Sequence, residues 1–66
     1  MYSWEINNKL QKENYILSGD EYLDICENSP QISHVKYSGF DDTYEIWTTD
    51  NYHWKFRLMT KGEQEL

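Results

Sequence analysis

Residues 43–59 alternate between apolar and polar side chains at every second position, on both sides of a short polar turn. Period-two alternation places successive side chains on opposite faces of a β-sheet. The pattern therefore predicts a β-hairpin with strands over residues 42–48 and 52–59. One face of this hairpin is aromatic and aliphatic, while the other carries charged side chains together with Trp47 and His53.

The length of the hairpin loop decides which side chains face one another. A two-residue turn would pair Ile46 with Lys55 and mix the two faces. A three-residue loop ending at Asn51 instead pairs Ile46 with Trp54. This loop requires a left-handed residue, a conformation that asparagine tolerates, so we expect Asn51 at positive φ.

A third strand is predicted over residues 32–37, followed by a turn over residues 38–41. The same parity argument places Val35 opposite Tyr44 and Ile32 opposite Trp47. The predicted core face comprises Val35, Tyr37, Tyr44, Ile46, Trp54, Phe56 and Leu58. The predicted outer face comprises Ile32, His34, Lys36, Glu45, Trp47, His53, Lys55 and Arg57.

Two short helices are predicted ahead of the strands. Over residues 3–13, apolar side chains recur at four-residue steps and Ser3 can cap the first turn, although a strand over residues 2–6 is the alternative. Over residues 18–27, Ser18 and Glu21 have capping-box spacing, and Pro30 cannot extend this helix. Its predicted inward stripe is Tyr22, Ile25 and Cys26, with Leu23 at the edge.

These elements predict one small α+β domain over residues 1–66. Its order is ααβββ, with two helices on one face of a three-stranded antiparallel meander. Residues 62–66 are expected to fray. Eleven of the 66 residues are aromatic, and large rings help such a short chain to bury a core. Dimerisation would bury further area.

The net charge is −6, and acidic surfaces attract basic proteins and repel nucleic acid and membranes. The first residues lack the basic and apolar regions of a signal peptide, and no apolar run reaches the ~20 residues of a membrane span. We therefore expect a cytoplasmic protein close to a complete small gene product. If it is encoded by a phage, the compartment is the host cytoplasm.

Candidate catalytic and metal-binding groups are few. Cys26, His34 and His53 are the soft metal ligands, and a zinc site needs about four. The predicted sheet separates the cysteine from both histidines, which argues against a metal site and against a Cys-His nucleophile. No phosphate-binding loop or serine elbow is present. The expectation is a non-enzymatic protein without metal or cofactor.

Two surfaces could bind a partner. On the second helix, Asp20, Asp24 and Glu27 lie at i, i+4 and i+7, flanked by Glu21, so their carboxylates share one face. This face could replace phosphates at a basic groove of a protein, with Trp47 among the apolar anchors.

The outer sheet face is the alternative surface. Its ring and donors, Trp47, His53, Lys55 and Arg57, could bind single-stranded nucleic acid by stacking. A further alternative is that this face forms a homodimer in a structural or assembly protein.

In size, acidity and tyrosine content the chain resembles small phage and mobile-element proteins that block host defence nucleases, such as anti-CRISPR inhibitors. The resemblance is one of composition. It implies an inhibitor that occludes the nucleic-acid-binding groove of a host protein. Together with the acidic helix, it predicts an acidic protein-binding module.

Overall fold

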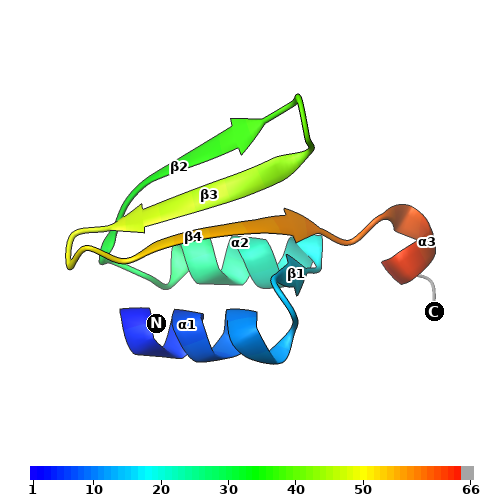
Figure 1. The fold of residues 1–66 in the computed structure, drawn as a ribbon. Helices are drawn as coiled ribbons and strands as arrows, with labels where there is room; N and C mark the ends of the chain where they lie inside the picture. Colours follow the sequence, from blue (N-terminus) through cyan, green and yellow to red (C-terminus); the bar gives the residue numbers. More distant parts are fainter. Residues whose placement is uncertain (65–66) are drawn as a thin grey trace.

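The computed structural model describes residues 1–64 of the 66-residue chain. In chain order its elements are α1 (Ser3–Lys12), β1 (Ile16–Leu17), α2 (Gly19–Glu27), β2 (Ile32–Ser38), β3 (Thr43–Thr48), β4 (His53–Leu58) and α3 (Lys61–Gln64). The strands form one mixed sheet in the order β1-β4-β3-β2, in which β1 runs parallel to β4 (Figure 1). The α+β class is confirmed. The predicted ααβββ order and three-stranded meander were wrong, because β1 adds an edge strand and α3 follows β4.

The strand β1 depends on how α1 ends. The Tyr15 amide donates to the Leu10 carbonyl at 2.8 Å and the Asn14 amide donates to Gln11 at 3.2 Å, which is the hydrogen-bond pattern of a Schellman motif. Asn14 takes the left-handed conformation at φ 55°, as this motif requires. The chain then turns alongside β4, where the Tyr15 carbonyl accepts a hydrogen bond from the backbone amide of Arg57 at 3.1 Å.

The starts of the two helices differ. The Ser18 hydroxyl accepts from the Glu21 amide and Glu21 accepts from the Ser18 amide, both at 3.1 Å, so the predicted capping box is confirmed. Ser3 was wrongly predicted to cap α1, whose N-cap residue is Tyr2. The buried Ser3 hydroxyl instead donates to Asp50 at 2.7 Å, which ties α1 to the β3–β4 loop.

The β3–β4 hairpin has the predicted register. Ile46 lies opposite Trp54 and Tyr44 opposite Phe56, and Asn51 has a φ of 72°. Both faces keep their composition because the loop has the length that the alternation demands.

The β2–β3 register was wrongly predicted. Val35 lies opposite Ile46 rather than Tyr44. The loop comprises residues 39–42 instead of the predicted 38–41, and this displacement by one residue shifts the pairing by two positions. A two-residue shift keeps each side chain on its face. Ile32 is an exception, since an irregularity between Ile32 and His34 pairs it with Thr48 and lets it pack against the core.

The core lies between the helices and one face of the sheet. Its buried side chains are Ile6, Leu10, Leu17, Ile25, Ile46, Trp54 and Phe56. The Trp54 indole donates to the Asn7 amide oxygen at 3.0 Å and so links β4 to α1. Both helices cover the same face, as predicted.

The edge strand β2 lies beyond this helical layer. Val35 and Tyr37 were predicted core residues, but they are 37% and 52% exposed. On α2, Tyr22 packs on Tyr44 and Phe56, with centroids 5.0 and 5.8 Å apart, which places this helix against β3 and β4. In Figure 1, β2 correspondingly projects away from both helices. Its inward side chains therefore face solvent.

The chain continues as a helical turn after β4. The Arg57 guanidinium binds both carboxylate oxygens of Glu63 at 2.9 Å, and the Thr60 amide donates to Glu63 at 2.8 Å. Residues 61–64 are thus held in α3, although residues 62–66 were expected to fray. Residues 65 and 66 lie outside the described residues.

Candidate functional site

The outward face of α2 carries three carboxylates and a leucine. Asp20, Asp24 and Glu27 are exposed, and Leu23 is 55% exposed although it is apolar. Helical spacing puts Leu23 three residues after Asp20 and four before Glu27, so the leucine lies among the acids. We call Asp20, Leu23, Asp24 and Glu27 the acidic helix face.

Glu21 was grouped with these acids from sequence, but the structure gives it other partners. Its carboxylate lies 3.0 Å from the Lys9 ammonium of α1, besides capping α2. Partial burial raises the pKa of Glu21, but hydrogen bonds from Lys9 and Ser18 outweigh this and leave it below its ordinary value. Glu21 therefore joins the two helices rather than the acidic helix face.

The acidic helix face has no compensating cation within residues 1–64. None of the salt bridges there includes Asp20, Asp24 or Glu27. Asp24 accepts a hydrogen bond from the Asn28 side chain at 2.8 Å, which is a neutral partner. Three negative charges thus remain available to an external cation.

On the outer sheet face, Trp47 is enclosed between two histidines. The His34 ring lies 4.3 Å from the indole at 11°, and the His53 ring lies 4.7 Å away at 14°. The His53 Nε2 is also 3.2 Å from a Glu45 carboxylate oxygen. Both faces of Trp47 are therefore occupied, and a nucleobase would have to displace a histidine to stack on it.

Two of the three lysine and arginine side chains of the outer face are also paired. The Lys55 ammonium lies 3.1 Å from Asp41, and Arg57 forms its bidentate pair with Glu63. A phosphate would have to compete with these carboxylates for both side chains. The outer face does bring together Trp47, His53, Lys55 and Arg57. Each of these side chains already has a partner, because the two rings stack on each other and the two cations are paired with acids.

Cys26 lies in α2 and is partly exposed. Burial raises the pKa of its thiol, despite a hydrogen bond from Tyr22 that lowers it. A neutral thiol is a poor nucleophile and metal ligand. Among residues 1–64, no group of three or more His, Cys, Asp or Glu side chains is arranged to hold a metal ion.

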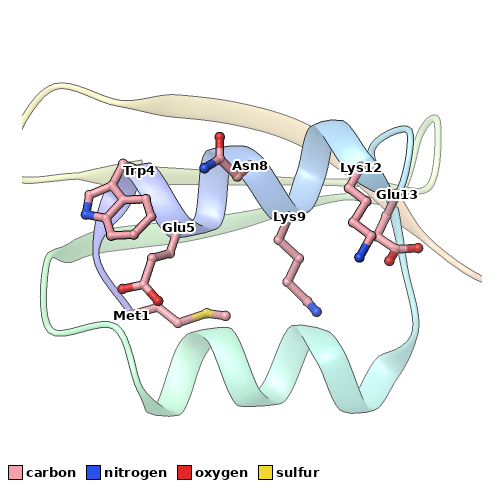
Figure 2. Close-up of a pocket in the computed structure, with 7 residues that line it drawn as sticks. All are labelled: Met1, Trp4, Glu5, Asn8, Lys9, Lys12 and Glu13. Carbon is pink, nitrogen blue, oxygen red and sulfur yellow. The ribbon is translucent and has the colours of Figure 1, made fainter.

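The clearest hollow of the described surface runs along α1 and has a volume of about 360 Å³. Figure 2 shows its lining side chains, Met1, Trp4, Glu5, Asn8, Lys9, Lys12 and Glu13. Two lysines and two glutamates balance in charge, and Lys9 already binds Glu21. This shallow groove therefore favours no particular charge of ligand.

Sequence reasoning missed the exposed residues near β2. Phe40 is fully exposed, and Tyr37 and Val35 are partly exposed on the helix side of the strand. A phenylalanine within an otherwise polar turn is a signal that could have drawn attention to Phe40. The exposure of the other two depends on where α2 packs, which the sequence pattern does not encode.

Comparison with protein-family models, curated proteins and solved structures finds no match to this chain. Within the described residues, no helix has both the length and the apolar character needed to cross a membrane.

Proposed function

We propose that this chain is a non-enzymatic, acidic protein-binding module that occludes a basic nucleic-acid-binding groove of its partner. The observation that supports the proposal is the acidic helix face, where three exposed carboxylates have no compensating cation among residues 1–64 and surround a half-exposed leucine. The carboxylates would take the place of phosphates. Leu23 would supply an apolar contact at the centre of the interface, where binding energy usually concentrates.

The nucleic-acid alternative has less support. Its ring, Trp47, has both faces covered, and Lys55 and Arg57 are paired with acids. The net charge of −6 also opposes a polyanion. A homodimer through the outer sheet face remains the other alternative, and sedimentation of the wild-type chain would detect it.

The compositional likeness to anti-CRISPR and other anti-defence proteins suggests the class of partner. In that case a phage or mobile element encodes the chain, which acts in the host cytoplasm on a nucleic-acid-handling enzyme. Occlusion of the enzyme's groove would prevent binding of its nucleic acid.

A charge-matched pair of variants tests the acidic helix face. Asp20→Asn, Asp24→Asn and Glu27→Gln together change the net charge from −6 to −3. The control set Gln11→Lys, Ser33→Lys and Thr49→Lys changes it equally, at exposed neutral positions outside α2. Affinity for a basic partner recovered by pull-down would be measured against salt concentration.

We expect the α2 set to weaken binding by about tenfold or more, because three charges that attract the basic partner are removed. The salt dependence of binding should also decrease, because the attraction between exposed charges is screened by salt over ~8–10 Å. Much of the loss should be slower association. The control set should bind nearly as the wild type does. Equal losses in the two sets would show that only net charge matters and would remove the acidic helix face from the interface.

A further inference from the structure

Phe40 is a large apolar side chain with no part of its surface buried. It lies in the loop of residues 39–42 between β2 and β3. A phenylalanine ring can bury about 150 Å² or more of surface when a partner encloses it. Within residues 1–64, no part of the fold covers this ring.

The loop that presents Phe40 is held by side-chain hydrogen bonds to Asp41 and Asp42, the two residues that follow it. Asp41 accepts from the Thr43 hydroxyl at 2.7 Å and from the Lys55 ammonium at 3.1 Å. Hydrogen bonds from Thr43, Lys55 and Ser38 lower the pKa of Asp41 to about 2, so it remains charged. Asp41 thereby ties the loop to both β3 and β4.

Asp42, the next residue, is also held by a side-chain hydrogen bond. Asp42 accepts from the Tyr37 hydroxyl at 2.8 Å and adopts a left-handed φ of 56°, which aspartate tolerates better than most residues. A loop already fixed in one conformation loses less entropy when it binds. The loop is therefore organised to present Phe40.

A row of aromatic side chains connects β2, which precedes the Phe40 loop, to α2. Tyr37 packs on Tyr44 with centroids 4.8 Å apart, and Tyr44 packs on Tyr22 of α2 at 5.0 Å. Val35 lies two residues before Tyr37 on the same face of the strand. We call Val35, Tyr37, Phe40, Asp41 and Asp42 the hairpin-tip surface.

We propose that Phe40 anchors this chain in an apolar pocket of a protein partner whose rim carries lysine or arginine. Asp41 is already paired with Lys55, but Asp42 has the neutral Tyr37 hydroxyl as its partner. The Asp42 carboxylate would reach the rim when Phe40 enters the pocket, and its negative charge favours a basic rim. The inference rests on the proposed function only in that the partner is a basic protein.

The Asp42 carboxylate also argues against other occupants. An anionic leaflet would repel it, and so would a second copy of a chain with a net charge of −6. Vesicles and self-association are therefore arms of the test.

The first experiment places a photo-crosslinking benzoylphenylalanine at position 40 in the full chain, expressed in the cells of origin. The control has the same group at the exposed Thr49, in the other hairpin loop. We expect a crosslinked protein from position 40 and none from position 49. Absence of a protein adduct at position 40, or the same adduct from both positions, would overturn the proposal.

The second experiment measures the affinity of the purified crosslinked partner. Phe40→Ala should weaken binding by roughly thirtyfold, the loss expected of an interface hot spot. Thr49 is exposed in the β3–β4 loop, at the other end of β3, and Thr49→Ala should change the affinity by less than about twofold. Asp42→Asn, which can still accept from Tyr37, should weaken binding severalfold and reduce its salt dependence.

The outcomes separate this inference from the proposed function. A loss with Phe40→Ala but none with the neutralised α2 set would keep the anchor and remove the acidic helix face. The reverse pattern would overturn the anchor alone. Phe40-dependent binding to phosphatidylserine vesicles, or a wild-type dimer abolished by Phe40→Ala, would assign the ring to a different occupant and overturn the proposal.

Discussion

At the scale of single residues, the two tryptophans of the β3–β4 hairpin show how a face of the sheet decides a side chain's role. Trp54 is 5% exposed, packs in the core and donates to Asn7. Trp47 points to the outer face and is partly shielded by His34 and His53. The same residue type therefore stabilises the core at one position and a surface stack at the other.

This contrast predicts different costs for the two alanine substitutions. Trp54→Ala should lower the free energy of unfolding by ~3–5 kcal/mol, as for a buried aromatic. Trp47→Ala should cost ~1–3 kcal/mol, because each stacked ring contributes ~0.5–1.5 kcal/mol. Urea unfolding would measure both, with Trp4→Ala, at a 60% exposed site, as the control. Equal costs at positions 47 and 54 would mean that Trp47 is buried as deeply as Trp54, which would contradict its position on the outer face.

At the scale of elements, local hydrogen bonds define where the helices begin and end. The Ser18–Glu21 capping box starts α2, and the Schellman motif at Asn14 ends α1. Between these two caps the chain has room only for the two-residue strand β1. Its pairing with β4 makes the sheet mixed.

The capping box can be tested by substitution. Ser18→Ala should cost about 1 kcal/mol, within a range of roughly 0.5–2, because the Glu21 amide loses its acceptor. Ser33→Ala, at an exposed position of β2, should stay within about 0.5 kcal/mol. Amide hydrogen exchange should accelerate at Glu21 in the Ser18 variant. Unchanged exchange there would mean that packing alone sets the start of α2.

At the scale of the whole molecule, the acidic side chains fall into two groups, those paired with a cation and those without one among the described residues. Acids near the sheet bind Lys55, Arg57 and His53, whereas those of the acidic helix face bind no cation among the described residues. Paired carboxylates contribute to stability, and unpaired ones are available to a partner. This division separates the groups that matter for folding from those proposed to bind.

The paired carboxylates predict loss of stability in acid. Hydrogen bonds from Thr43, Lys55 and Ser38 lower the pKa of Asp41 to about 2, and the Arg57 guanidinium together with the Thr60 amide lowers that of Glu63 to about 2. Their folded pKa values lie below the ordinary 3.8 and 4.5, so their contribution is complete above those values and is lost as pH falls through about 2.

We therefore expect the free energy of unfolding to fall progressively below about pH 4.5, with NMR titration midpoints near 2 for both carboxyls. Thr43→Val should move the Asp41 midpoint back toward its ordinary value. Asp41→Asn should flatten the acid dependence. Ordinary midpoints in the wild type would show that these contacts do not persist in solution.

The sequence by itself determined features that depend on neighbouring residues. Alternation and loop length set the β3–β4 register, and the spacing of Ser18 and Glu21 set the capping box, because these interactions close over a few residues. The three acids of the acidic helix face could likewise be named from their helical spacing, since i, i+3 and i+4 positions meet on one side. The sequence pattern placed Leu23 at the edge of the inward stripe, whereas the structure leaves it 55% exposed among these acids.

Only the tertiary structure decided the features that join distant segments. The β1–β4 pair, the Lys9–Glu21 bridge and the His34–Trp47 stack each bring together residues that local patterns leave unconnected. The exposure of β2 depends equally on where α2 packs. Because many long-range arrangements satisfy the same apolar pattern, the packing of the whole chain selects among them.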